Sequence, residues 1–150
     1  FGVIKKAEES KIKNEHGEID IALIKFYSRY NYNVPEIKED KDISEGDQIF
    51  SLGYRDGLIV PKHTIRFIRG NIISIAEDNQ LEGIELFFDG PLVRGMSGGP
   101  IFNEDGKLIG INQGGELEKS DVVGSENIET GVQTGVPIKY YFQLLRLLKS

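Results

Sequence analysis

The sequence predicts an all-β fold that ends in a short helix. Its 150 residues include 18 glycines, and its apolar segments are short and interrupted by glycine, aspartate and asparagine, as in proteins built from strands and tight turns. The segment after Pro137 instead has apolar residues at helical spacing. A chain of this length allows one domain with a stable core, or one complete barrel and part of another.

Residues 18–26 predict a strand that begins beside an acidic residue, Asp20. A carboxylate in such a place can accept a hydrogen bond from the Nδ1–H of an imidazole and stabilise the imidazolium form. A simpler interpretation is equally available for this segment alone, because aspartate is common at the turn or edge that precedes a strand. Residues 44–54 predict a further turn that leads into a buried strand, and they bear on the fold and not on chemistry.

The most informative segment is 94–102, where Ser97 stands among Gly95, Gly98 and Gly99 just ahead of an apolar strand. Glycine permits a tight turn and brings backbone N–H groups close to a neighbouring side chain. Acyl transfer needs this arrangement, with a hydroxyl nucleophile and N–H donors directed at the developing oxyanion. A glycine-rich turn in any β-protein would explain the glycines, but not the further matches along the chain.

Residues 95–99 also fit the Gly-x-Ser-x-Gly nucleophile elbow of α/β-hydrolases, which lies between a strand and a helix. Here the motif is followed by a predicted hairpin, with a turn at 103–106 and a returning strand at 107–111. No histidine follows His63, whereas the elbow enzymes have theirs after the serine. The elbow interpretation is therefore excluded.

The end of the chain predicts a strand at 130–136 and a helix at 137–148. Pro137 suits the first position of that helix, and apolar residues recur along one of its faces. These residues are Ile138, Tyr141, Phe142, Leu145 and Leu148.

Taken in order, these segments resemble the chymotrypsin/trypsin-like serine proteases, and the resemblance covers nearly the whole chain. It implies a chymotrypsin-like double β-barrel. Residues 1–45 would be the remainder of an incomplete first barrel that carries the triad aspartate, Asp20. Residues 46–150 would be the second barrel, with the nucleophile Ser97 and the short C-terminal helix. The same resemblance makes the backbone N–H groups of Gly95 and Ser97 the oxyanion hole.

Met96 indicates a branch of the family. In the zymogen-activated branch, the residue before the nucleophile is an aspartate that pairs with a newly freed N-terminus. Methionine cannot form that ion pair, so we expect no activation by N-terminal cleavage and a closer similarity to the bacterial stress proteases. We also expect the Met96 side chain to lie between the two barrels.

The resemblance also implies a primary substrate pocket. Its residues are Pro91 and Leu92 at the base, Arg94 at the rim, Gln113, Gly114 and Gly115 in the wall strand that pairs with substrate backbone, and Gly131 and Gln133 facing the pocket. No carboxylate lies at the base, so we expect cleavage beside an apolar or small residue and not after lysine or arginine. Gly114 leaves the wall open, although Gly114 and Gly115 also fit a plain turn into a polar loop at 116–129.

The family's histidine lies in an Ala-His motif tens of residues before the aspartate, but only about twenty residues precede Asp20. His16 falls at a predicted hairpin tip and His63 just before a strand, and neither matches the motif. We expect the chain to be the C-terminal part of a longer protein whose missing half-barrel supplies the histidine, because six strands cannot be completed from the residues before 42. The alternative is a natural pseudoprotease that lacks the base.

Composition limits the partners. The absence of cysteine favours an intracellular or bacterial protein over a cross-linked digestive protease. The net charge of −6 argues against general nucleic-acid binding. The sequence has no segment long enough to cross a membrane, and no metal-ligand cluster or phosphate loop. We therefore expect a peptide or protein partner and no cofactor.

Two function classes stay open. The first is a serine endopeptidase that cleaves peptide bonds through an acyl-enzyme on Ser97, with the histidine supplied by sequence not present here. The second is an inactive trypsin-like module that binds peptides or partner proteins along an open strand edge by β-augmentation. The intact set of Asp20, Gly95, Ser97 and Gly99 favours the enzyme, because a binding module has no need of it.

Overall fold

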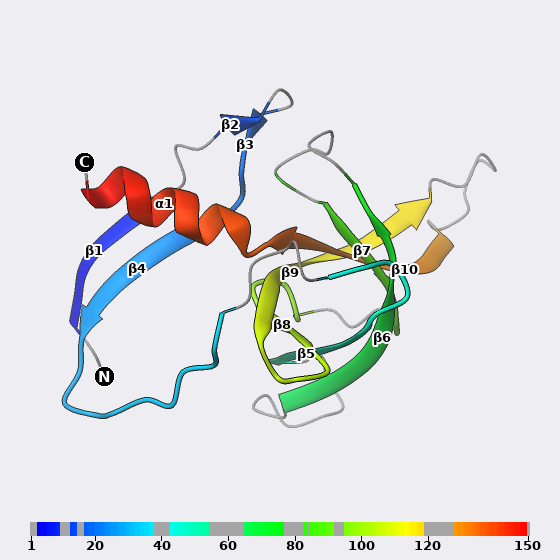
Figure 1. The fold of residues 1–150 in the computed structure, drawn as a ribbon, viewed down its shortest axis with the longest axis horizontal. Coiled ribbons are helices and arrows are strands. Elements are labelled where there is room, and N and C mark those ends of the chain that lie inside the picture. Colours follow the sequence, from blue (N-terminus) through cyan, green and yellow to red (C-terminus); the bar gives the residue numbers. More distant parts are fainter. Residues whose placement is uncertain are drawn as a thin grey trace.

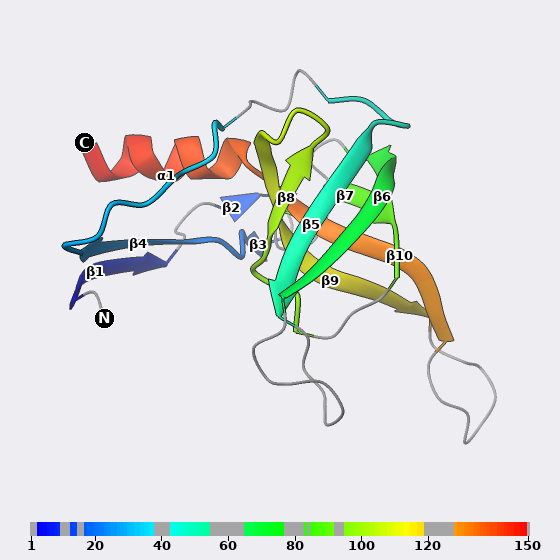
Figure 2. The ribbon, with the colours of Figure 1, turned by 90° about the horizontal axis from the view of Figure 1, so that it is seen from below.

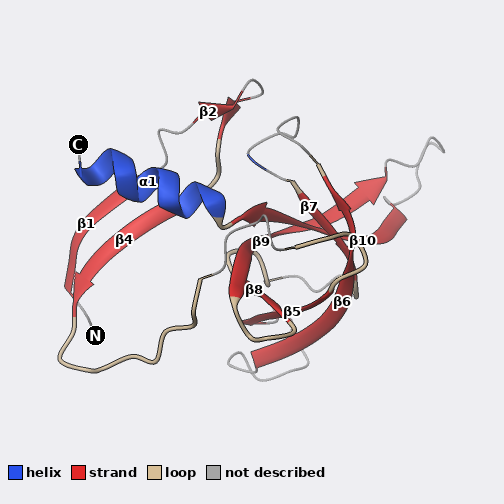
Figure 3. Cartoon of the chain, in the orientation of Figure 1, coloured by secondary structure: helices blue, strands red, loops and turns tan. Residues whose placement is uncertain are grey.

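In the computed structural model, most of the described residues lie in strands, and a helix follows at the C-terminal end (Figure 3). The residues that it describes are 3–9, 13–14, 17–37, 43–54, 65–76, 83, 85–91, 95–118 and 128–149. The elements are β1 (Val3–Glu9), β2 (Lys13–Asn14), β3 (Gly17–Glu18), β4 (Ala22–Tyr27), β5 (Gln48–Tyr54), β6 (Ile65–Ile75), β7 (Leu86–Asp89), β8 (Pro100–Asn103), β9 (Leu108–Glu118), β10 (Ile128–Pro137) and α1 (Lys139–Lys149). Among these residues, no helix has the length and apolar character needed to span a membrane.

Six antiparallel strands close into a barrel in the order β10-β7-β6-β5-β8-β9 (Figure 1). Closure pairs each strand with a neighbour on both sides for part of its length, while β9 beyond Asn112 pairs with β10 alone. The fold that the sequence predicts, a mostly β structure with a β-barrel and a short C-terminal helix, is confirmed.

Apolar side chains from the barrel strands form the core, because alternate residues of each strand point inward. On β6, Ile68, Gly70 and Ile72 are buried while the residues between them are exposed. Met96 also belongs to this core, only 2% exposed. The sequence suggested a place between two barrels for its side chain. The structure instead packs it against Gly53 of β5, where a Cβ atom would lie 2.9 Å from the Met96 Cα.

Outside the barrel, β1 and β4 form a two-stranded antiparallel ribbon, and β2 and β3 form a second, shorter pair. Figures 1 and 2 both show the ribbon and α1 on the same side of the barrel. Large apolar side chains on β4 are exposed, with Ile24 at 51% and Phe26 at 48%.

The polar segment 116–129, predicted as a loop, is partly strand. Strand β9 continues to Glu118, strand β10 begins at Ile128, and these two residues are paired. Pairing depends on backbone N–H and C=O groups, so a polar sequence does not prevent it. The predicted turn at 103–106, by contrast, lies between β8 and β9 as expected, with Gly106 N–H donating to the Asn103 carbonyl at 3.0 Å.

The prediction that Pro137 opens the helix is wrong. Pro137 is the last residue of β10 and pairs with Gly110 of β9, and α1 begins at Lys139. Because proline lacks an N–H group, a strand end tolerates it better than a strand centre does.

The buried face of α1 also differs from the predicted one. Tyr140 and Leu144 are its most buried side chains, each 3% exposed, and they lie four residues apart on one face. Tyr141, Phe142 and Leu145 are half-buried, and the side chain of Leu148 lies outside the described residues.

Candidate active site

Ser97 lies in a tight turn immediately before β8, and its side chain is exposed. Gly95 and Gly98 have φ angles of 90° and 81°, in the left-handed region that glycine adopts without steric cost. The turn is fastened to β9 by two backbone bonds. Gly98 N–H donates to the Asn112 carbonyl at 2.7 Å, and Asn112 N–H donates to the Gly99 carbonyl at 2.8 Å.

Asp20 lies just ahead of β4 and is exposed beside a buried neighbour. Ile19 is 2% exposed and packs in a small apolar cluster with Val136 and Tyr140, which joins this segment to the barrel and the helix. The Ile21 N–H donates to the Ile19 carbonyl at 2.9 Å, so the chain turns sharply at Asp20. The backbone at Asp20 is therefore positioned by the residues on either side of it.

Gln113 of β9 contacts both residues. Its side-chain Nε2 donates to the Asp20 Oδ2 at 2.6 Å, and its backbone carbonyl accepts a hydrogen bond from the Ser97 Oγ at 2.9 Å. The sequence placed Gln113 in a substrate-binding wall and gave no indication of these contacts. These hydrogen bonds join residues that are 93 and 16 positions apart in the chain, so a local sequence pattern cannot predict them.

A cavity of about 640 Å³ contains this constellation. Its remaining walls are mainly apolar. They are formed by Ile21, Ala22, Val34, Pro35, Ile37, Gly98, Leu108, Ile111, Ile138 and Tyr141. A second cavity of about 370 Å³ is lined by residues of β5 and of the turn from Gly95 to Pro100, so Ser97 borders two hollows. Ser97 is thus accessible from the two hollows that it borders.

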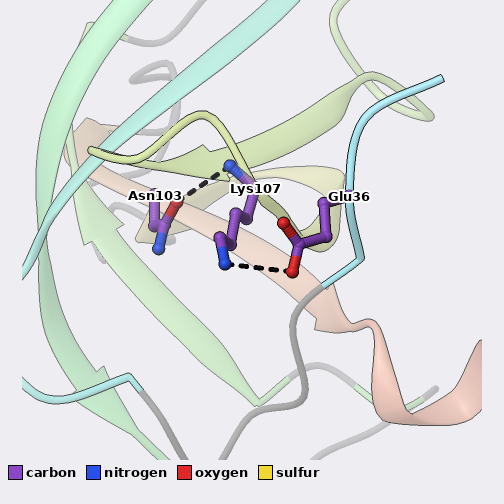
Figure 4. Close-up of polar contacts among 3 residues, drawn as sticks. All are labelled: Glu36, Asn103 and Lys107. Atoms are coloured by element: carbon purple, nitrogen blue, oxygen red, sulfur yellow. Dashed lines mark hydrogen bonds and ion pairs between the residues drawn. The ribbon is translucent and has the colours of Figure 1, made fainter.

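The cavity wall at 34–37 is tied to the hairpin between β8 and β9 (Figure 4). The Leu108 N–H donates to the Glu36 carbonyl at 2.8 Å, and Ile37 forms a parallel bridge with Leu108. Lys107 forms an ion pair with Glu36 at 3.0 Å, while its own N–H donates to the Asn103 Oδ1 at 2.9 Å. Backbone and side-chain bonds therefore hold this wall together.

We expect Glu36→Gln to lower the free energy of unfolding by less than about 1 kcal/mol, because exposed ion pairs contribute little. The Lys107 and Glu36 side chains are 32% and 70% exposed. Urea denaturation of the variant checks this. A loss well above that value would show that the ion pair, and not the backbone contact, fixes the wall.

The remaining predicted pocket residues are placed as follows. Pro91 is exposed, and Leu92 and Arg94 lie outside the described residues. A Cβ atom at Gly114 would lie 3.8 Å from the Ser97 Oγ, so Gly114 borders the serine. Gly115 pairs with Gln133, which is 2% exposed and whose Nε2 has no hydrogen-bond partner among the residues that the structure describes. Gly131 is exposed, with a φ angle of 77°.

His16 and His63 lie outside the described residues. The structure brings a carboxylate, Asp20, and a hydroxyl, Ser97, into one cavity, where Gln113 contacts the first through its side-chain amide and the second through its backbone carbonyl.

The barrel is that of a trypsin-like fold, and the chain belongs to the trypsin-like peptidase domain family, whose model matches residues 4–111. Two curated relatives are the probable periplasmic serine endoprotease DegP-like proteins of Rickettsia prowazekii and Rickettsia conorii. Each is 30% identical to the chain over 105 residues. Each match covers 69% of this chain but only 20% of the relative, so the chain spans about a fifth of their length.

Solved structures agree on the fold. The HtrA-type protease AlgW with a decapeptide has a TM-score of 0.62 and 23% identity, covering 86% of this chain and 36% of that chain. The same protease with a tripeptide has a TM-score of 0.63 and 21% identity, covering 86% and 40%. The predicted trypsin-like family is thereby confirmed, and the relatives and structures that the chain resembles are bacterial serine proteases of the DegP-like and HtrA types.

Proposed function

We propose that this chain is the nucleophile-bearing part of a serine endopeptidase. Ser97 attacks the carbonyl carbon of a peptide bond, and Asp20 orients a histidine supplied by sequence outside this chain. The observation that supports this most strongly is the shared cavity, which Asp20 and Ser97 both line although they are far apart in the sequence. Membership of the trypsin-like peptidase family supports the same roles for Asp20 and Ser97.

In this mechanism the histidine takes the Ser97 proton as the hydroxyl oxygen bonds to the carbonyl carbon. The backbone N–H groups of Gly95 and Ser97 stabilise the oxyanion that forms, and one such donor contributes about a hundred- to a thousandfold in rate. The leaving amine then accepts the proton, and water releases the acyl group from Ser97. Gly95, with its φ of 90°, suits a turn that directs an amide toward the oxyanion.

A division of the chain into parts of two barrels is consistent with the same proposal. We propose that residues 1–45 are the remainder of a first barrel and that residues 46–150 are the second. The exposed Ile24 and Phe26 side chains on β4 are typical of a surface that packs against further protein.

The substrate is proposed to be a peptide or protein with an apolar or small residue at the cleaved bond. Its backbone would pair with the β9 segment at Gln113, Gly114 and Gly115. Pro91, Leu92 and Arg94 would line the pocket with Gly131 and Gln133. Structures of the HtrA-type protease AlgW that hold a decapeptide and a tripeptide are consistent with a peptide ligand.

A second candidate is an inactive module that binds peptides without cleaving them. The hydrogen bonds of Gln113 favour this function, because they engage both Asp20 and Ser97 without any base. An enzyme and a binding module differ in whether Ser97 is activated.

Labelling with a fluorophosphonate probe, followed by intact-mass analysis of the natural protein, distinguishes the two. We expect one adduct that disappears in Ser97→Ala and persists in Ser28→Ala, a matched exposed serine on the segment after β4. The mass of the untreated protein also gives the length of the mature chain. A mass that matches these 150 residues, with no adduct, would overturn the endopeptidase and leave the peptide-binding module.

A further inference from the structure

The outer surface of the barrel carries a cluster of apolar side chains on β5 and β6. Successive side chains of a strand lie on opposite faces, so alternate residues of these strands point outward. Ile65 and Phe67 on β6 are each 60% exposed, and Tyr54 on β5 is 56% exposed. The pairing of the strands places Tyr54 opposite Ile65. The Phe50 and Phe67 rings stack on the same surface, with their centroids 5.2 Å apart. Clustered apolar groups of this kind are typical of an interaction surface, whereas single exposed ones are not.

This cluster continues into the smaller of the two hollows that Ser97 borders. The hollow of about 370 Å³ is lined by Leu52 and Tyr54 of β5, by Ile65 of β6, and by the turn from Gly95 to Pro100. Among the described residues that line it, none is charged. The apolar surface therefore begins at the serine turn and runs along the two strands. We call it the β5–β6 face, which consists of Phe50, Leu52, Tyr54, Ile65 and Phe67.

The β5–β6 face and strand β9 lie on different sides of the serine turn. Backbone bonds of Gly98 and Gly99 join the turn to Asn112 of β9. On the other side the turn lies against β5, since a Cβ atom at Gly99 would be 2.1 Å from the Leu52 carbonyl oxygen. A peptide that pairs with β9 up to the bond attacked by Ser97 therefore continues, beyond that bond, toward β5 and β6.

A cation lies at the end of the face that is farther from the serine turn. Arg69 of β6 is exposed and pairs with Phe50 of β5. It is the only charged residue among the described outward residues of the two strands, the others being Gln48, Phe50, Leu52, Tyr54, Ile65, Phe67, Asn71 and Ile73. A strand rises about 3.3 Å per residue, so Ile65 and Arg69 are about 13 Å apart along β6. An extended peptide covers that distance in about four residues.

We propose that the β5–β6 face binds the segment of the substrate that follows the cleaved bond, and that it selects an apolar residue next to the bond and an acidic residue about four positions further on. This inference rests on the proposed function, because Ser97 sets the position of the cleaved bond. The apolar side chain occupies the hollow and covers Tyr54 and Ile65, which removes apolar surface from water. The acidic side chain pairs with Arg69.

Peptide binding to the natural protein that carries Ser97→Ala tests the apolar part without cleavage. The probe is a peptide with a free N-terminus, leucine first, aspartate four positions later and fluorescein at its C-terminal end, and its anisotropy gives Kd. We expect Ile65→Ser in the protein, or leucine to alanine in the peptide, to weaken binding about tenfold. The matched control is Ile73→Ser, an outward residue of the same strand beyond Arg69 that is 48% exposed, and it should leave Kd unchanged.

A charge exchange tests the acidic part. Arg69→Glu should weaken binding of the aspartate peptide about fivefold, because an exposed ion pair is replaced by repulsion. The same variant should bind a peptide with lysine in place of aspartate more tightly than the natural surface does, which structural damage would not produce. Circular dichroism shows whether each variant is folded. An unchanged charge preference in Arg69→Glu, equal effects of Ile65→Ser and Ile73→Ser, or no binding of the peptide would overturn the proposal.

Fluorophosphonate labelling of Ser97 separates this inference from the proposed function. Labelling of Ser97, together with peptide binding that neither Ile65→Ser nor Arg69→Glu changes, would support the endopeptidase and overturn the docking surface. Binding with the expected preferences in a protein whose serine is not labelled would support the docking surface and contradict the endopeptidase. Self-association that Ile65→Ser abolishes, measured by analytical ultracentrifugation and without peptide binding, would assign the β5–β6 face to a second copy of the chain and overturn the proposal.

Discussion

Gly99→Ala is expected to lower the free energy of unfolding by about 3 kcal/mol and to abolish labelling of Ser97. A Cβ atom at this position would lie 2.1 Å from the Leu52 carbonyl oxygen and 2.9 Å from the Met96 carbonyl oxygen. Both neighbours are backbone atoms, so no side chain can rotate away to make room. Strand β5, which carries Leu52, is paired with β6 and with β8 and cannot shift without disturbing the barrel.

Urea denaturation and fluorophosphonate labelling together measure this effect. The matched control is Gly106→Ala, at a turn with a φ of 74° where a Cβ atom meets nothing within 4 Å. That change should cost only the left-handed backbone strain, about 1–2 kcal/mol, and leave labelling intact. Equal losses in the two variants would show that close approach to Leu52 is not the reason for glycine at position 99.

The parts of the site that the sequence predicts correctly are those encoded by neighbouring residues. The strand after Asp20 and the hairpin after the serine follow from turn residues beside alternating apolar residues, and both lie where expected. Glycine at positions 95 and 98 predicts a tight turn, and both residues have positive φ angles there. Their assigned roles in catalysis stay predictions until Ser97 is tested.

The parts that the sequence misses depend on tertiary contacts. In the sequence, Gln113 is an ordinary polar residue that follows an apolar segment. Only the folded structure places its side-chain amide beside Asp20. The start of α1 is missed for a similar reason, because pairing of Pro137 with Gly110 extends β10 past the point where proline alone suggests a helix.

Glu85 is the clearest case of this kind, and it joins the barrel to α1. Glu85 is 1% exposed, and its carboxylate forms an ion pair with Lys139 and accepts a hydrogen bond from the Tyr140 hydroxyl. Nothing in the local sequence marks this glutamate as buried, since charged residues are almost never fully buried unless paired. The pairing brings together residues 54 and 55 positions apart, and it fixes the start of a helix whose Tyr141 lines the cavity.

Lys139→Met is therefore expected to lower the free energy of unfolding by about 3 kcal/mol, because it leaves the Glu85 charge buried without its cation. This lies at the lower end of the range for a broken buried pair, since the Lys139 side chain is 37% exposed and already partly hydrated. Urea denaturation measures the loss. Arg146→Met is the matched control, an exposed cation on the same helix that should change stability by no more than about 0.5 kcal/mol.

The double variant Glu85→Gln with Lys139→Met separates charge burial from packing. Neutral glutamine keeps most of the shape of Glu85 and can still bond to the Tyr140 hydroxyl, so it should restore most of the stability that Lys139→Met removes. A single Lys139→Met loss no greater than that of Arg146→Met would show that the helix is held by Tyr140 and Leu144 packing alone. A large loss that the double variant does not recover would assign the effect to packing of the lysine's alkyl chain. Recovery of stability in the double variant would identify the buried Glu85 carboxylate as the reason that α1 depends on a cation at position 139. The cavity wall at Tyr141 would then depend on the same ion pair.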